Sequence, residues 1–150
     1  MDIKVRQIPI EQPEILEIRC HTLTDEIEEI ISFVKSGQGQ IGAKKNGRDV
    51  EISVIDIFYA ESVDNRVFIY TANESFEVRQ RLYELEEILP SAFVRISKSA
   101  IVNITKIRSV KRNITGPSEI EFEGTIKRAY ASRNYLKQLM NRLEEKRLNK

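Results

Sequence analysis

The sequence predicts a mainly β fold with three helices, one near the N-terminus, one in the middle and one at the C-terminus. Segment 41–52, IGAKKNGRDVEI, contains an Asn-Gly pair, which is a strong signal for a hairpin turn between two short strands. Segments 56–62 and 66–71 are rich in β-branched and aromatic residues, which strands favour. Apolar residues recur at helical spacing in three other segments. At 150 residues the chain fits one globular domain with a small appendage.

The N-terminal part, residues 1–40, predicts an extension with one short strand and one acidic amphipathic helix. Residues 15–20, ILEIRC, alternate apolar and polar side chains imperfectly, which predicts the strand. Thr24 can cap the helix that follows, and Asp25 and Glu26 lie in its first turn, where the helix dipole favours them. The apolar face of this helix is formed by Ile27, Ile30, Ile31 and Val34. Because its opposite face is acidic, we do not expect it to bind an anion.

The central part predicts further strands followed by a helix. The short segment 63–65 connects the two β segments on either side of it, and another strand is expected around 75–77. The segment 78–89 has helical spacing, and Pro90 ends it. The apolar stripe of this helix is formed by Val78, Leu82, Leu85, Ile88 and Leu89.

The C-terminal part predicts short strands and then the last helix. Strands are expected at 93–96, 104–110, 118–123 and 125–131, with a polar turn after the first of them. The final helix has an apolar side formed by Tyr135, Leu136, Leu139, Met140 and Leu143, and Ser132 can cap it. Residues 41–150 are therefore expected to form the main domain.

Charge is distributed unevenly along the chain. Residues 1–90 carry 10 Lys and Arg against 18 Asp and Glu, whereas residues 91–150 carry 14 against 5, although the whole chain has a net charge of +1. This asymmetry predicts that the C-terminal part faces an anion. The alternative is that the two halves attract each other, within one molecule or in a dimer.

The sequence contains no combination of residues that predicts catalysis, a metal or a cofactor. Cys20 and His21 are the only cysteine and histidine, and they have no further ligands at metal-binding spacing. No phosphate-binding loop, dinucleotide fingerprint or G-x-S-x-G motif occurs. The first residues lack the apolar run of a signal peptide, and no run of about 18 apolar residues could span a membrane. We therefore expect a non-enzymatic, cytoplasmic protein without cofactors.

Three motifs, in order, resemble the LytTR DNA-binding domain family over residues 41–140. The segment 57–62 fits I-x-x-x-E-S, and Ser132 begins a match to S-R-x-Y. The central motif, F-x-R-x-x-x-S-x-x-V-N, is met by Phe93, Arg95, Ser99, Val102 and Asn103. The resemblance implies an elongated β sandwich of short strands whose loops enter successive major grooves and contact the minor groove between them. It also implies a bacterial, sequence-specific transcription regulator of double-stranded DNA that reads direct repeats near promoters.

The resemblance also implies which residues contact DNA. Base readers are expected at Asn65, Lys98 and Asn134. Phosphate contacts are expected from Arg66, Arg95, Ser97, Ser99, Arg133 and Lys137. At two base-reading positions this chain has an amide where relatives frequently have a basic residue or His; an amide prefers adenine, so the preferred bases cannot be copied from relatives. Asn103 is expected to satisfy backbone groups rather than touch DNA.

About 40 residues precede the matched region, too few for the phospho-receiver domain that many family members carry. The sequence therefore predicts a stand-alone regulator without a phosphorylation switch of its own. Segment 15–35 either docks a regulatory partner, such as the membrane proteins that restrain some stand-alone relatives, or caps an open sheet edge. A homodimer is also open.

Two other classes of function are weighed against DNA binding. An RNA-binding module would use the same basic residues but usually stacks bases on exposed aromatic rings. The aromatic residues here mostly lie in strands beside apolar neighbours, which is typical of a core. An interaction protein that sequesters another regulator would instead present the basic half to an acidic partner.

Overall fold

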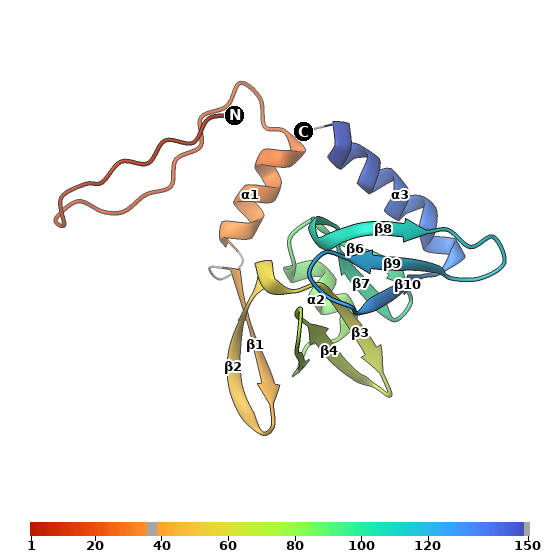
Figure 1. The fold of residues 1–150 in the computed structure, drawn as a ribbon. Coiled ribbons are helices and arrows are strands. Elements are labelled where there is room, and N and C mark those ends of the chain that lie inside the picture. The colour runs from red at the N-terminus through yellow and green to blue at the C-terminus, as the bar shows by residue number, and fades with distance from the viewer. Residues whose placement is uncertain (36–38, 149–150) are drawn as a thin grey trace.

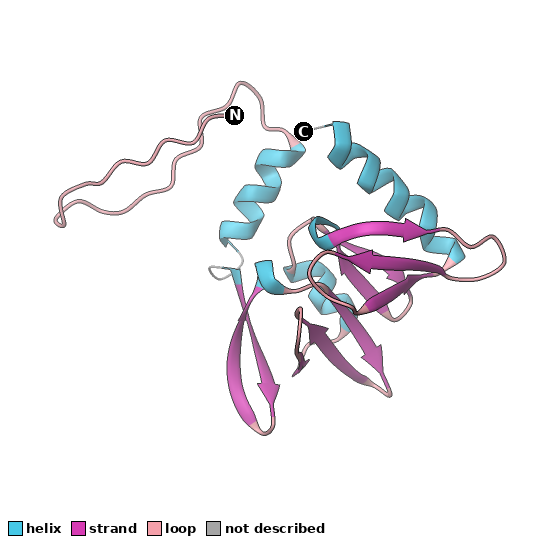
Figure 2. Ribbon diagram, in the orientation of Figure 1, coloured by secondary structure: helices cyan, strands magenta, loops and turns pink. Residues whose placement is uncertain are grey.

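The computed structural model describes residues 1–35 and 39–148 and has a β-rich fold with three α-helices (Figures 1 and 2). Two short 3₁₀ turns, Val54–Asp56 and Ile104–Lys106, interrupt the strands. The remaining elements are, in chain order, α1 (Asp25–Lys35), β1 (Gln40–Lys45), β2 (Arg48–Ser53), β3 (Tyr59–Val63), β4 (Arg66–Tyr70), β5 (Ser75–Val78), α2 (Leu82–Ile88), β6 (Phe93–Ser97), β7 (Ala100–Asn103), β8 (Ile107–Lys111), β9 (Ser118–Phe122), β10 (Arg128–Ala131) and α3 (Arg133–Leu148).

The strands form two antiparallel sheets. The larger has seven strands in the order β2-β1-β5-β4-β3-β7-β6, and the smaller has three in the order β10-β9-β8. β3 pairs with β7 so that Tyr59 lies opposite Val102, which joins the central hairpin to the β6–β7 hairpin. The predicted β sandwich of short strands is confirmed by this arrangement.

Two tight turns have the backbone that short hairpins require. Asn46 and Gly47 have φ values of 52° and 76°, and Asp64 and Asn65 have φ values of 50° and 62°. Successive positive φ values are the signature of the type I′ turn, whose twist matches that of the strands it joins. The hairpin predicted at Asn46-Gly47 is confirmed, and the same geometry holds Asn65 at the tip of the β3–β4 hairpin.

Two apolar clusters form the core. The first lies between the β1–β5 part of the large sheet and α2, which contributes Leu82, Leu85 and the following Leu89. The second lies between the large and small sheets, where the rings of Phe58 and Phe122 pack edge to face. Leu139 of α3 belongs to the same cluster. The start of α3 is therefore held on the protein by buried side chains.

The N-terminal helix is confirmed, including its cap, because the amide of Ile27 donates to Oγ1 of Thr24 over 3.4 Å. Ile27 is buried, and Phe33 packs against the first core cluster. Arg142 of α3 donates to Glu29 of α1 over 3.3 Å and to the carbonyl of Ser91 over 2.8 Å. These contacts tie α1 to the body of the molecule.

The predicted starts of one helix and one strand were wrong. The central helix begins at Leu82 rather than at residue 78, because Val78 pairs with Val67 in the sheet and packs in the first core cluster. Tertiary pairing here overrides the helical spacing. The strand predicted from residue 104 begins only at Ile107, after a 3₁₀ turn.

The strand predicted at 15–20 was also wrong. These residues form no strand, and apart from half-buried Ile18 they are exposed. Alternating side chains favour an extended backbone, but a strand also needs a neighbour that accepts and donates its hydrogen bonds, and no described segment of this chain pairs with it.

Candidate nucleic-acid interface

Three segments that are distant in the sequence meet at one edge of the molecule. The amide of Ser62, at the end of β3, donates to the carbonyl of Ser99 over 2.8 Å. The amide of Ser132, just before α3, donates to the carbonyl of Ile96 over 2.8 Å. The β3–β4 turn, the β6–β7 turn and the first turn of α3 are thus joined, and residues 63–66, 97–99 and 132–137 are called the loop edge below.

The β6–β7 turn, residues 97–99, is held in one shape by local hydrogen bonds. The amide of Ser99 donates to Oγ of Ser97 over 3.1 Å, and the two hydroxyl oxygens are 3.4 Å apart. The register between β6 and β7 shifts between Arg95 and Ser97. The side chain of Lys98 is exposed at the tip of this turn. A turn fixed in advance loses little conformational freedom when a ligand binds.

Arg95 is the main support of that turn. Its Nε donates to the carbonyl of Ser97 over 2.7 Å, one terminal nitrogen donates to the carbonyl of Lys98, and the other donates to Glu86 over 2.8 Å. Only 18% of its side chain is exposed. These bonds use three of the five N–H donors of the guanidinium, so the group is fixed in place and the phosphate contact predicted for Arg95 would fall to the two remaining donors.

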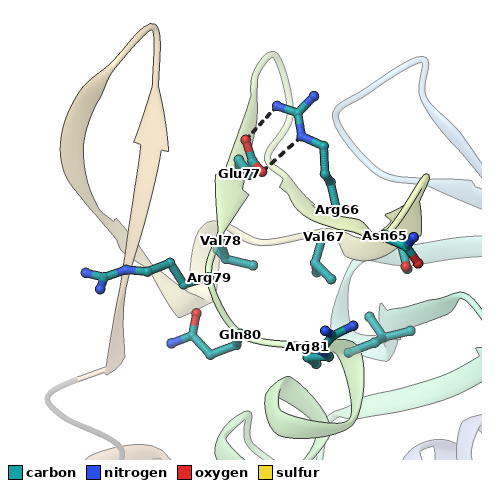
Figure 3. Close-up of a pocket in the computed structure, with 10 residues that line it drawn as sticks. Asn65, Arg66, Val67, Glu77, Val78, Arg79, Gln80 and Arg81 are labelled. Atoms are coloured by element: carbon teal, nitrogen blue, oxygen red, sulfur yellow. Dashed lines mark hydrogen bonds and ion pairs between the residues drawn. The ribbon is translucent and has the colours of Figure 1, made fainter.

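The β3–β4 turn presents Asn65 and Arg66. Asn65 is exposed at the tip, and Arg66 on β4 donates two hydrogen bonds to Glu77 on β5, over 2.7 Å and 3.0 Å (Figure 3). The bond from Arg66 holds the pKa of the Glu77 carboxyl below its usual value. Arg66 can therefore contact a phosphate in two ways. It either keeps its hydrogen bonds to Glu77, which partly neutralises its charge, or it breaks them.

A shallow cavity of about 240 Å³ adjoins the same turn and contains a basic residue that the sequence did not single out. Its lining includes Asn65, Arg66 and Arg81, the last of which immediately precedes α2. Arg79 projects away from Asn65 and Arg66 (Figure 3). Arg81 is exposed, and no ion pair holds its side chain within the described part of the chain. The only sequence signal was the R-Q-R triplet before the central helix, which carries no motif.

The first turn of α3 presents the remaining predicted residues. Arg133, Asn134 and Lys137 are exposed, and their side chains form no ion pair or hydrogen bond among the residues described. The carbonyl of Ser132 accepts the first helical hydrogen bonds, from Tyr135 and Leu136, each over 3.1 Å. The free amides at a helix start favour an anion, whereas cations placed there repel the helix dipole until an anion binds.

Some basic residues outside the loop edge are paired with acids. In the small sheet, Arg128 on β10 lies 2.9 Å from Glu119, and Arg108 on β8 lies 3.9 Å from Glu121.

The structure brings eight of the predicted site residues to the loop edge, and Arg95 lies behind it. The eight are Asn65, Arg66, Ser97, Lys98, Ser99, Arg133, Asn134 and Lys137.

Asn103 has the structural role that was predicted for it. It is 3% exposed, and its amide nitrogen donates to the carbonyl of Ile57 over 2.9 Å. Its side-chain oxygen accepts from both the amide and the hydroxyl of Thr105, over 3.1 Å and 2.7 Å. The residue thereby fixes the turn that follows β7.

Residues 1–35 and 39–148 contain neither a metal-binding cluster nor a membrane-spanning helix. No three His, Cys, Asp or Glu side chains in these ranges are grouped so that they could hold a metal ion. No helix within them has both the length and the apolar character needed to cross a bilayer.

Comparison with known proteins assigns this chain to a family. The model of the LytTr DNA-binding domain matches residues 47–144. An uncharacterised HTH-type transcriptional regulator of Staphylococcus aureus strain NCTC 8325 is 37% identical over 92 residues, which cover 61% of this chain and 62% of the relative. One from the bovine strain RF122 is 31% identical over 131 residues, which cover 85% of this chain and 88% of the relative. The match to the NCTC 8325 protein, and to several similar Staphylococcus aureus proteins, therefore spans less than two thirds of the relative's length.

A solved structure has the same fold. It is the LytTr DNA-binding domain of a protein described as a methyl-accepting/DNA response regulator from Bacillus cereus, with a TM-score of 0.64 and 19% sequence identity. The superposition covers 70% of this chain and 96% of that chain.

Proposed function

The chain belongs to the LytTr DNA-binding domain family, and from that premise we propose that it is a bacterial transcription regulator that binds double-stranded DNA through the loop edge. One observation carries the choice of surface. Three segments separated by about 30 residues each are joined by backbone hydrogen bonds, and each presents exposed donors. A row of exposed cations and amides on a rigid support suits a phosphate backbone with accessible base edges.

Each segment of the loop edge supplies one base-reading side chain. Lys98 at the β6–β7 tip can donate to O6 and N7 of guanine, while Asn65 and Asn134 are amides that suit N6 and N7 of adenine. Phosphate contacts come from the flanking side chains Arg66, Ser97, Ser99, Arg133 and Lys137. A phosphate at the start of α3 would also relieve the repulsion between Arg133 and the helix dipole.

Two further residues have roles that the geometry favours. Arg81 is a phosphate contact beside the Asn65 turn, because it is exposed and unpaired in the described structure and shares a cavity with that turn. Arg95 acts mainly by positioning Lys98, because three of its five guanidinium donors bond the turn and Glu86 and its side chain is largely buried.

The DNA is read as direct repeats near promoters, one copy of the chain at each repeat. Residues 41–150 form the DNA-binding domain, and residues 1–40 form an extension that does not read bases, because α1 carries Asp25, Glu26 and Glu28 in its first turn. We assign no enzymatic activity to the chain, and we place it in the cytoplasm, where bacterial DNA lies. A regulatory partner that contacts residues 15–35 is compatible with the exposure of residues 15–24 apart from Ile18.

The test is selection of bound sequences from a randomised double-stranded DNA pool, followed by a salt titration on the best site. We expect an enriched repeated motif, and a slope of log affinity against log salt of about −4 to −7, for about five to eight neutralised phosphates. A pool without an enriched motif, or a slope near zero, would contradict the proposal.

Binding to RNA is tested in the same assay with a single-stranded RNA competitor. Several aromatic rings that could stack on bases are buried, namely Phe58, Tyr59, Phe93 and Phe122. We therefore expect RNA to compete only through its charge, with no preferred sequence.

A further inference from the structure

The first 23 residues form an arm that the described rest of the molecule leaves exposed to solvent. They contain no helix or strand, and all are exposed except Ile18, which is half-buried. The chain leaves the body, reverses where the amide of Gln12 donates to the carbonyl of Pro9 over 3.0 Å, and returns to α1 (Figure 1). No hydrogen bond or ion pair connects the arm to residues 39–148.

The arm nevertheless has the side-chain pattern of strands that bury one face. Apolar residues occur at every second position in three runs, which are Ile3 and Val5, Ile8 and Ile10, and Leu16, Ile18 and Cys20, with Ile15 as an extra apolar residue before the third run. Val5 is 89% exposed and Leu16 is 68% exposed. An extended backbone with unpaired amides and carbonyls, and with apolar side chains in water, is suited to pairing with another chain.

The charges of the two limbs of the arm are complementary. The limb before the turn carries Lys4 and Arg6 against Asp2, whereas the limb after it carries Glu14 and Glu17 against Arg19, which lies 3.3 Å from Glu17. Two copies related by a two-fold axis would place the first limb of one copy against the second limb of the other, twice. Opposite charges facing each other across antiparallel strands favour that register.

We propose that the arm pairs with the arm of a second copy and makes the chain a homodimer. A single two-stranded hairpin is marginal in water, whereas two arms together form a sheet that can bury its apolar face against the partner. Since α1 is tied to α3 by the Arg142–Glu29 contact, the pairing also sets the distance between the two loop edges. The proposal concerns the arm alone and does not depend on which surface binds DNA.

The first measurement is the mass of the full chain by sedimentation velocity, over about 1–50 µM. We expect a dimer that dissociates when Val5 and Leu16 are both replaced by Glu. The matched control replaces Ile114 and Ile126, which are 90% and 93% exposed in loops of the main domain, by Glu. The control should remain a dimer. A monomeric wild-type chain at about 50 µM, or equal dissociation of variant and control, would overturn the proposal.

The second measurement separates pairing between copies from pairing within one arm. Variant one carries Lys4→Glu and Arg6→Glu, and variant two carries Glu14→Lys and Glu17→Lys. Each alone should be monomeric, because like charges then face each other, whereas an equimolar mixture should form a heterodimer. The mixture is followed by its mass in sedimentation velocity, which needs no label on the arm. A mixture that stays monomeric would show that the limbs do not pair between copies.

DNA binding is measured in parallel, on an oligonucleotide with a single repeat. The arm variants should bind it with affinity within about twofold of the unmodified chain, and should lose only the preference for two correctly spaced repeats. Failure of every variant and of the wild type to bind a single repeat would contradict the proposed function instead. Dimerisation through the arm would remain testable by mass.

Discussion

The loop edge and the small sheet both contain several basic residues, but these residues have different partners. Arg108 and Arg128 on the small sheet face Glu121 and Glu119 across neighbouring strands. On the loop edge, Lys98 and Arg133 have no acidic partner in the part of the chain that the structure describes. The contrast is not complete, because Arg66 on the loop edge is paired with Glu77 and Lys111 on the small sheet is exposed without an ion pair in the described part of the chain. A count of basic residues therefore does not by itself locate an anion-binding surface, and we assign that surface to the loop edge because three hydrogen-bonded segments present exposed donors there.

The basic stretch 93–112 illustrates the same difference within twenty residues. Arg95 is used to shape a turn, Lys106 lies over the ring of Phe58 at 5.2 Å, and Arg108 faces Glu121. Lys98 is exposed at the centre of the loop edge, between the Asn65 turn and the start of α3. One stretch of like charge therefore performs at least three structural tasks.

The largest effect is expected from Arg95→Met, which removes the support of the 97–99 turn. Affinity for the best DNA site should fall about 10- to 100-fold, since hydrogen bonds from a charged group contribute about 1.5–3 kcal/mol. The slope of log affinity against log salt should stay unchanged, because every cation that we assign to a phosphate is still present. A mobility-shift titration at several salt concentrations checks both, and a slope flatter by about one would show that Arg95 touches phosphate after all.

Lys98→Ala should remove a base-reading group without loosening the turn. We expect affinity for the best site to weaken by about 1–3 kcal/mol and the preference at one position of each repeat to relax. The melting temperature should change by no more than a few degrees, because the side chain is exposed. Selection on randomised sites with the variant is the measurement, and an unaltered preferred sequence with full affinity would show that the tip does not read bases.

Arg133→Ala should weaken binding by a smaller amount that does not depend on sequence. Removing a cation that neutralises phosphate at the start of α3 weakens binding to all DNA sites about equally and flattens the salt slope by about one unit. The same salt titration is performed on a best site and on an unrelated duplex. A weakening confined to the best site would assign Arg133 to base reading instead.

Arg128→Ala on the small sheet should have the smallest effect on DNA. Its charge is shared with Glu119, so we expect DNA affinity within about twofold of the unmodified chain. The partly exposed ion pair itself contributes at most about 1 kcal/mol to folding, and a thermal melt measures that part. A decrease in DNA affinity of about tenfold would extend the interface onto the small sheet.

The elements with a local chemical signal were predictable from the sequence. The Asn46-Gly47 turn, the Thr24 cap and the buried side of α3 each depend on neighbouring residues, and all are present. The strand at 15–20 was predicted wrongly because alternation does not show whether a pairing partner exists. The predicted central helix began too early, at Val78, because helical spacing does not show that this residue pairs with Val67 of a neighbouring strand.

The site was less predictable, because its chemistry depends on register. The bonds from Arg95 to two carbonyls lie where the register shifts after Arg95, and Arg128 meets Glu119 only when β9 and β10 are paired. Neither could be seen in the linear sequence. Arg81 was missed for the same reason, since its closeness to Asn65 is created by the fold.

The most direct test compares two double variants that remove the same charge. One carries Lys98→Ala and Arg133→Ala on the loop edge, and the other carries Arg108→Ala and Arg128→Ala on the small sheet. Affinity for the selected DNA site is measured at one salt concentration for both. The affinity of the loop-edge variant should fall at least about tenfold further than that of the small-sheet variant. Equal decreases, or a larger decrease from the small sheet, would contradict the assignment of DNA binding to the loop edge.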